Sequence, residues 1–366
     1  MPFAGPAPAA PVTVRSTHGT TAPVRCDLDE LRPRDDYAVL RRAIGERGLL
    51  DKHPGYYGLH ALALVGLLAL ICVCVVLTGD ARLRVLCALP AAFLFGQLGF
   101  LAHDAAHAQV FRSPRRNYLL SVLLFNLLLG GSRGWWSDKH NAHHGSPNQV
   151  GRDPDAEFSV LALSADQALA ATGVPRLMMR CQAQLIVPLL LLEAINIHVH
   201  SIRFVLRRNL RNPGGEALML VVHYVLYLGA IPYFLGLWTG LLFIAVHQAL
   251  LGLYLGAAFI TNHIGMVVPQ PEDGMDFLTG QVVTARNIRG GGAVDLMFGS
   301  LTCQIEHHLF PNMPRNRLRT AAPVVRAFCE QRGVAYRETG LLEAYGQVLQ
   351  HLATMAAIAR RPRPRS

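Results

Sequence analysis

Seven of the sixteen histidines lie in three short segments of the sequence. The segments are 103–107 (His-Asp-Ala-Ala-His), 140–144 (His-Asn-Ala-His-His) and 304–308 (Gln-Ile-Glu-His-His). On a helix, positions i, i+3 and i+4 share one face, so the histidines of a segment point into one small volume. Neutral imidazole is the commonest metal ligand among side chains. The recurrence predicts a metal site built from His103, His107, His140, His143, His144, His307 and His308.

The composition is that of a membrane protein. Hydrophobic residues make up 51% of the chain against 16% charged residues, and the apolar residues come in long runs. The seven cysteines are odd in number and include no Cys-x-x-Cys pair, which argues against a disulfide framework. The net charge is +10, but the arginines flank apolar runs and do not form one dense face. We therefore expect an anionic membrane surface as partner, with no nucleic acid, and an acidic electron carrier as a second partner.

Four apolar segments approach the length of about 20 residues that a bilayer requires. We expect membrane-spanning helices over about 59–78, 84–102, 217–236 and 238–260. They lie in a membrane domain of residues 26–345, between an N-terminal tail and a C-terminal tail. The first tail, 1–25, is rich in Ala, Pro and Thr and is expected to be disordered, whereas the second, 346–366, is basic.

Two further apolar stretches are not expected to cross the membrane. Residues 118–129 are too few, and 185–192 run into polar residues, so we expect a re-entrant or interfacial segment and an interfacial helix, respectively. Two spans then precede the first histidine segment and two separate the second from the third. All three segments emerge on one side, which the flanking arginines place in the cytoplasm. The expected fold is an all-α integral membrane protein with a cytoplasmic helical cap.

The number of imidazoles favours two metal ions, because seven exceed the coordination of one first-row ion. Redox-active iron suits a site at a membrane surface within reach of an acyl chain. Two non-haem irons can activate O2 and take hydrogen from an unactivated methylene, which no side chain can do alone. A ferritin-like, carboxylate-bridged site would need Glu-x-x-His pairs on bundle helices, and the sequence contains none.

In this order, the three segments resemble the histidine boxes of the membrane fatty acid desaturase family. The third continues to Leu-Phe-Pro at 309–311, and Asn148 and Asp-Pro-Asp at 153–155 match the family's usual continuation after the second box. The resemblance runs from about residue 49 to about residue 323. It implies four spanning helices and a cytoplasmic cap that holds two non-haem irons. It further implies O2 as co-substrate and an acyl chain on lipid, CoA or a carrier protein.

The resemblance also implies the roles of single residues. The seven box histidines would be iron ligands, and His263, at the end of the fourth span, would be an eighth. Gln304 stands where most subgroups have His. Gln at this position resembles the front-end subgroup, whose members insert a double bond between an existing one and the carboxyl end. Gln304, Asn148, Asp153 and Asp155 would support the ligands, with Gln304 able to act through water. Front-end enzymes of eukaryotes usually carry a fused haem domain. None is recognisable here, so we expect a separate donor such as ferredoxin with its reductase.

Several residues near the boxes have an ordinary structural interpretation as well. Asp153 and Asp155 could hydrogen-bond to ligand imidazoles or simply form a turn. For Asp104, capping of a helix end is favoured over orientation of a ligand. Trp136 is interpreted as a membrane-interface residue, and Glu306 is assigned no catalytic role.

Three alternative functions share some of these features. A hydroxylase or ketone-forming enzyme of the same di-iron superfamily would keep the fold and change the product. An intramembrane metalloprotease is weakly suggested by 103–107, which has Asp where His-Glu-x-x-His needs its general base. A metal transporter would place its site near the bilayer midplane, whereas these boxes lie at span ends.

Overall fold

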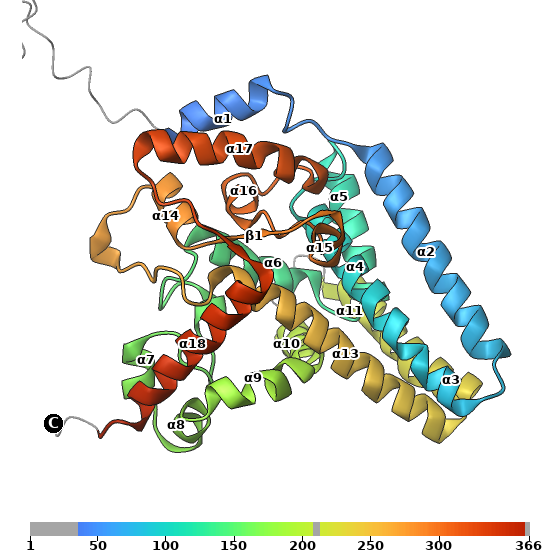
Figure 1. Cartoon of the computed structure of the whole chain (residues 1–366). Coiled ribbons are helices and arrows are strands. Elements are labelled where there is room, and N and C mark those ends of the chain that lie inside the picture. The colour runs from blue at the N-terminus through green and yellow to red at the C-terminus, as the bar shows by residue number, and fades with distance from the viewer. Residues whose placement is uncertain (1–35, 208–212, 363–366) are drawn as a thin grey trace, which may run out of the picture.

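The computed structural model describes residues 36–207 and 213–362, and these are mostly helical (Figure 1). The tail expected over 1–25 lies outside the described residues. Four helical segments are long and apolar enough to cross a membrane. They cover Pro54–Leu77, Ala81–Ala106, Gly214–Leu235 and Leu237–His263, and each overlaps one of the expected spans.

These spans differ in how much protein surrounds them. The first is α2 (Pro54–Leu77), and the second consists of α3 (Ala81–Leu86) and α4 (Ala88–Ala106). The third is made of α11 (Pro213–Val225), η4 (Leu226–Ala230) and α12 (Ile231–Leu235), and the fourth is α13 (Leu237–His263). Over the most apolar stretch of each span, 11% of the residues are buried in the first span and 56% in the second. A helix that is apolar on all sides suits a lipid environment, so α2 is peripheral and α4 is central.

Glycines allow the central helices to approach one another closely. A Cβ on Gly96 of α4 would lie 2.2 Å from the ring of Tyr254 on α13. A Cβ on Gly252 of α13 would lie 2.7 Å from the carbonyl oxygen of Leu190. Small residues at helix contacts are characteristic of packing within membranes. They hold α13 against both α4 and the neighbouring α9 (Gln182–Leu191). Helices α4 and α13 carry His103 and His263 in their last turns.

The remaining elements gather where α4 and α13 end (Figure 1). Before the third span they are α1 (Asp36–Glu46), α5 (Pro114–Val122), η2 (Leu123–Leu128), α6 (Arg133–Gly145), η3 (Pro154–Ala156), α7 (Ala165–Ala170), α8 (Gly173–Met179), α9 (Gln182–Leu191) and α10 (Glu193–Leu206). After the fourth span they are η5 (Pro271–Asp273), α14 (Phe277–Val283), β1 (Asn287–Arg289), α15 (Gly292–Met297), α16 (Gln304–Leu309), α17 (Arg315–Arg332), β2 (Glu338–Gly340) and α18 (Leu341–Arg360).

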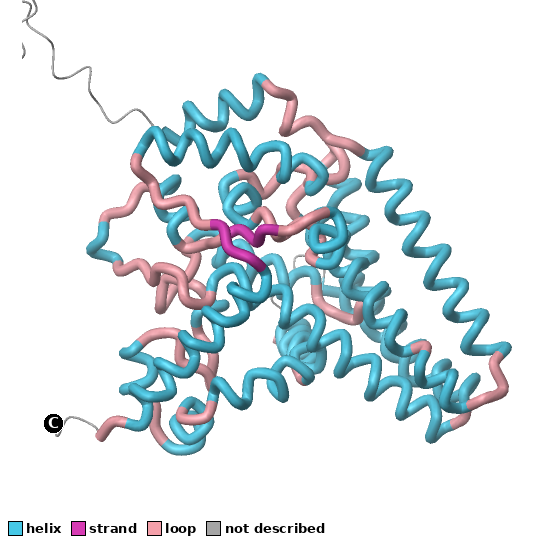
Figure 2. Tube along the Cα trace, viewed as in Figure 1, coloured by secondary structure: helices cyan, strands magenta, loops and turns pink. Residues whose placement is uncertain are grey.

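A short parallel ladder ties the chain before α16 to the chain before α18. Strands β1 and β2 pair with Ile288 opposite Thr339 (Figure 2). Ile288 is fully buried, and its backbone N–H donates to the carbonyl of Thr302. The ladder therefore anchors the segment that leads into the third box.

The stretch expected to be an interfacial helix is a bent pair. Helices α9 and α10 meet at an angle of 67° and together are long and apolar enough for a broken span or a re-entrant loop. They do not form one straight spanning helix. Their exposed apolar residues include Leu192, Ile195, Val199 and Ile202, whose spacing places them on one face. Such a face suits contact with lipid.

The prediction of a basic C-terminal tail over 346–366 is wrong for the part that the structure describes. Residues 341–360 form α18, which packs against α7, α9 and α13. Val348, Leu352 and Met355 recur at i, i+4 and i+7 and are buried. This spacing makes an apolar helix face. The run of arginines near the end obscured it.

Candidate metal centre

The structure brings all eight predicted ligands together from four helices and the residue that follows one of them. His103 lies in the last turn of α4, and His107 directly follows that helix. The others lie on α6 (His140, His143, His144), at the end of α13 (His263) and on α16 (His307, His308). Two groups each place one potential ligand atom per residue within 4.8 Å of the others. We call them group one (His103, His107, His140, His307) and group two (His143, His263, His308).

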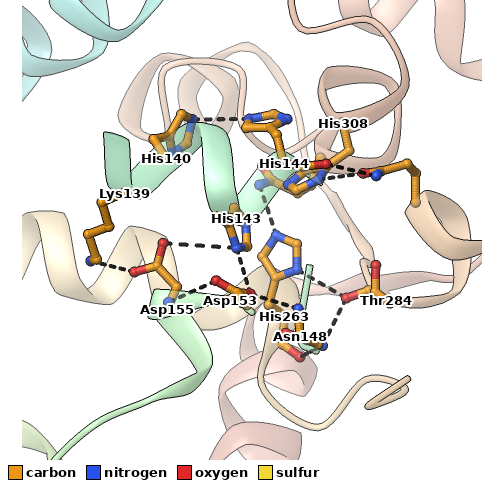
Figure 3. A network of polar contacts seen from close by, with 12 residues as sticks. Lys139, His140, His143, His144, Asn148, Asp153, Asp155, His263, Thr284 and His308 are labelled. Carbon is orange, nitrogen blue, oxygen red and sulfur yellow. Dashed lines mark hydrogen bonds and ion pairs between the residues drawn. The ribbon is translucent and has the colours of Figure 1, made fainter. Parts of the chain in front are cut away.

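Helix α6 contributes His140 to group one and His143 to group two, because the two residues lie about one turn apart along its axis. Its N-terminus is capped by Ser132, whose hydroxyl accepts from the N–H of Trp135 at 3.2 Å. His144 lies between the groups. Its ring stacks on that of His308 with centroids 4.3 Å apart, and its Nε2 is 3.0 Å from Nε2 of His140 (Figure 3).

The donor atoms of this cluster suit a metal. Within the cluster, buried ring nitrogens without a hydrogen-bond partner among the described residues occur in His103, His107, His144, His307 and His308. Outside it, His60, His223 and His247 each have one such nitrogen. Buried polar groups in folded proteins are nearly always satisfied, and a metal ion would satisfy these. Sets of imidazoles suit iron, copper, zinc or nickel. The residues present therefore fit a transition-metal centre.

Electrostatics keeps most of these rings in the form that binds metal. Burial and the neighbouring histidines hold the pKa of five of them well below the usual value for histidine: His107, His140, His144, His307 and His308. Desolvation is the larger cause in every case, because burial disfavours the charged imidazolium. Since only the neutral ring offers a lone pair, these rings need lose no proton to bind a metal near neutral pH.

Asp153 serves both as a turn residue and as a hydrogen-bond partner of a histidine. Its Oδ2 lies 2.8 Å from Nδ1 of His143 and accepts from the backbone N–H of Asn148 at 2.7 Å (Figure 3). Its Oδ1 accepts from the N–H of Asp155 at 2.8 Å, which caps η3. Burial opposes protonation of His143, but the bond to Asp153 and the two carboxylates raise its pKa above the usual value. Such a partner leaves Nε2 as the ligand atom.

Asp155 is less directly involved. It pairs with Lys139 at 2.5 Å and lies 3.9 Å from Nδ1 of His143. Burial raises the pKa of Asp155, but Lys139 and His143 outweigh this effect and lower it. Asp155 therefore adds negative charge near His143 without a hydrogen bond to it.

Asn148 fastens the loop after the second box to the end of α13. Its side-chain Nδ2 donates to the carbonyls of His263, Val267 and Thr284 at 3.1, 3.1 and 3.2 Å. The carbonyl of Thr284 in turn lies 3.0 Å from Nδ1 of His263 (Figure 3). A carbonyl can only accept, so His263 carries its proton on Nδ1 and directs the Nε2 lone pair elsewhere.

Gln304 reaches group two through its amide. Its Nε2 lies 3.1 Å from Nε2 of His263, and its Oε1 is buried without a partner among the described residues. Amide oxygen can bind a metal or a water. The amide of Gln304 therefore lies beside a candidate ligand, and its supporting role stays a prediction.

The Asp104 side chain contacts His103 and Arg315 and does not cap a helix end, so the favoured interpretation of it was wrong. Its Oδ1 lies 3.2 Å from Nδ1 of His103, and its Oδ2 accepts from Nε of the buried Arg315. The N–H of Arg315 donates to the hydroxyl of Tyr57 at 3.0 Å, and that hydroxyl donates to Gln109 at 3.0 Å. A buried network thus joins the first box, the start of α2 and the chain after the third box.

Trp136, for which the sequence favoured a place at the membrane interface, packs against two of the candidate ligands. Its ring stacks on His140 at 4.3 Å and contacts the edge of His103 at 5.5 Å. Glu306, in contrast, is fully buried and accepts from Asn287 and Tyr336 at 2.7 and 2.9 Å. Burial raises its pKa. Trp136 therefore belongs to the wall of group one, and Glu306 stabilises the segment around β1.

Sequence reasoning missed three contributors to the site: Gln281, Thr284 and Arg315. Gln281 bonds to Nδ1 of His308, Thr284 supplies a backbone carbonyl, and Arg315 pairs with Asp104. None of them lies within a box. A backbone carbonyl has no sequence signal, and the contacts of Gln281 and Arg315 join residues that lie far apart in the sequence.

The family follows from comparison with known proteins. Residues 82–340, more than half of the chain, match the family model described as fatty acid desaturase. The chain belongs to the fatty acid desaturase family. This membership confirms the resemblance drawn from the histidine boxes and indicates an oxidoreductase. The protease and transporter alternatives gain no support.

Curated relatives of this desaturase-family chain carry desaturase names. An acyl-lipid (9-3)-desaturase of Physcomitrium patens is 31% identical over 91% of this chain and 66% of its own length. A delta(8)-fatty-acid desaturase of Euglena gracilis is 28% identical over 90% of this chain and 80% of its own length. A delta(5) fatty acid desaturase of Caenorhabditis elegans is 31% identical over 74% of this chain. The chain spans about two thirds of the length of the first and 64% of that of the third.

Proposed function

We propose that this chain is an O2-dependent desaturase that introduces a carbon–carbon double bond into an acyl chain. In the overall reaction two neighbouring methylenes each lose one hydrogen. O2 takes up these two hydrogens, with two electrons and two protons from a donor, and leaves as two waters. The observation that carries the proposal is the pair of histidine groups built around α6, at the ends of two apolar helices, in a chain whose relatives are named desaturases.

The histidines would hold two non-haem irons, one in each group, with His144 between them. Bound iron would supply O2 activation and hydrogen abstraction, for which side chains have no equivalent. The protein's own part is to hold the rings. Asp104 and Asp153 bond to Nδ1 of His103 and His143 and leave Nε2 of each ring free. Gln304 offers its amide oxygen to the group-two ion, directly or through water.

The substrate we propose is an acyl chain carried by a membrane lipid. The name of the Physcomitrium patens relative includes "acyl-lipid". The third box of this chain begins with Gln304, the residue typical of front-end desaturases, and relatives named delta(8) and delta(5) desaturases fit that subgroup. Burial of the histidines would exclude bulk water from the reacting carbons.

The centre is proposed to lie on the cytoplasmic face. Arg115 and Arg116 follow the first box, and Arg203 and Arg207 precede the third span, as the excess of cations on cytoplasmic flanks predicts. Electrons would come from a separate donor, which we propose to be ferredoxin with its reductase. The net charge of +10 would favour encounter with such an acidic carrier.

The test is a fatty acid profile, with localisation of double bonds, of cells that express this chain together with a ferredoxin and its reductase. We expect a new unsaturated acid in the wild type, none in a His143→Ala variant, and two irons per wild-type chain. A hydroxylated or ketone product would instead establish the related superfamily activity. If a chain that retains two irons and sits in the membrane forms none of these products, the proposal is contradicted.

A further inference from the structure

Gln281 connects the second and third histidine boxes through a single side chain. It lies on α14, outside every box, and is 2% exposed. Its Nε2 donates to the backbone carbonyl of His144 at 2.9 Å, and its Oε1 lies 2.9 Å from Nδ1 of His308. One amide therefore contacts the main chain of α6 and a ring on α16.

The chemistry of the two partners fixes the orientation of this amide. A backbone carbonyl only accepts hydrogen bonds, so the NH2 end of Gln281 must face His144. The oxygen end then faces His308, and because oxygen cannot donate, Nδ1 of that ring must carry the proton. The lone pair is left on Nε2 of His308. This atom is buried without a partner among the described residues, in a ring of group two.

We propose that Gln281 is a positioning residue that fixes the tautomer and orientation of His308 as a metal ligand and sets the position of α16 relative to α6. The inference rests on the proposed metal centre, since it assigns Gln281 a role toward the group-two ion. A neutral amide does this without adding charge. The anionic Asp153 already faces His143 in the same group, so Gln281 completes the support while limiting the negative charge around the ion.

The chain contains a matched residue with a purely structural role. Gln182 is also fully buried, and its amide also bridges two segments, accepting from the N–H of Ala162 and donating to the carbonyls of Ala162 and Leu352. None of these partners is a histidine. Substitution of Gln182 therefore measures the effect of losing a buried bridging glutamine alone.

The experiment is an iron titration of the full-length chain in detergent, stripped with a chelator and reloaded with Fe(II) under anaerobic conditions. Wild type should bind two ions. In Gln281→Leu the bond to His308 is lost, and we expect one ion to bind about 10- to 100-fold more weakly while the other is unchanged. Gln182→Leu should lower the unfolding temperature and leave both affinities unchanged.

Gln281→Glu restores the contact with His308 alone, because its carboxylate accepts from Nδ1 as the amide oxygen does but cannot donate to the carbonyl of His144. It should restore binding of the second ion and change the Mössbauer signature of one iron, since the partner is now charged. If Gln281→Leu does not fold, Gln281→Glu still tests whether residue 281 positions His308.

Three results would overturn the inference. The first is a Gln281→Leu protein that binds both ions like the wild type, and the second is a Gln182→Leu protein that loses as much affinity. The third is a Gln281→Glu protein whose iron spectrum matches that of the wild type. A wild type that binds fewer than two ions would instead contradict the proposed metal centre itself.

Discussion

The two histidine groups differ in how the protein holds their rings. In group two every ring has an acceptor at Nδ1, namely Asp153 for His143, the carbonyl of Thr284 for His263 and Gln281 for His308. In group one, His103 has Asp104, whereas both ring nitrogens of His307 lack a partner within the described residues. Rings of group one pack mainly on one another, with centroids of His103 and His307 4.7 Å apart.

This contrast indicates two ways to build a site. Hydrogen bonds to Nδ1 fix both the tautomer and the ring plane, so group two is oriented before a metal binds. Group one depends on helix packing and on the ion itself for the orientation of His307. Its one strong anchor is the buried Asp104–Arg315 pair, whose charges are held away from water. Loss of metal should therefore disturb group one more than group two.

The largest expected effect is the loss of a ligand from either group. His143→Ala and His307→Ala should each leave about one iron per chain and lower desaturation by at least about 100-fold, because losing a ligand exceeds losing its hydrogen-bond partner. Metal analysis and product assay measure both. His351→Ala is the control, since that ring bonds to the carbonyl of Leu163 outside both groups. Retention of two irons by His143→Ala would remove that residue from the ligand set.

The anchor of group one should be costly to break. Asp104→Asn leaves Arg315, 3% exposed, without its carboxylate, and we expect the free energy of unfolding to fall by about 3–5 kcal/mol. The control is Arg319→Gln, since Arg319 lies on the same helix as Arg315 and forms a partly exposed ion pair with Asp295. Its loss should lower the free energy of unfolding by less than about 1 kcal/mol. Unfolding of the purified proteins would compare them. Equal losses would contradict the idea of a buried anchor.

Removal of metal tests the comparison directly. At an ion concentration of about 100 Kd, bound metal adds about 2.7 kcal/mol of stability, which chelation should remove. Hydrogen exchange after chelation should rise more at 103–107, which serves group one alone, than at the end of α13 near His263, which serves group two. Equal increases would show that the hydrogen bonds to Nδ1 do not keep group two in order.

Asp153→Asn should give the smallest change. An asparagine oxygen can still accept from Nδ1 of His143, but the charge is lost, and the group-two ion should bind about 10- to 100-fold more weakly. The unfolding temperature should change less than in Asp104→Asn, because Asp153 neutralises no buried guanidinium. Iron titration measures the first effect and thermal unfolding the second. Unaltered iron affinity would restrict Asp153 to its role in the turn.

Local pattern made much of this protein predictable. Apolar runs of about 20 residues identify spans because a bilayer accepts little else. The i, i+3 and i+4 spacing of histidines predicts a metal site because those positions share a helix face. The C-terminal helix was missed because charge at its end outweighed a weaker apolar period that only packing against α9 and α13 makes decisive.

The sequence by itself determined the family and the approximate spans, and it predicted the set of candidate ligands. Only the tertiary structure decided how the ligands divide. His307 and His308 are neighbours on α16, yet they belong to different groups because successive helical residues turn by about 100°. His140 and His143, about one turn apart on α6, are likewise divided between the groups. Only packing of the helices against one another separates group one from group two. It also brings Arg315 to Asp104 and Gln281 to His308, contacts between residues so distant in the chain that no local spacing could encode them.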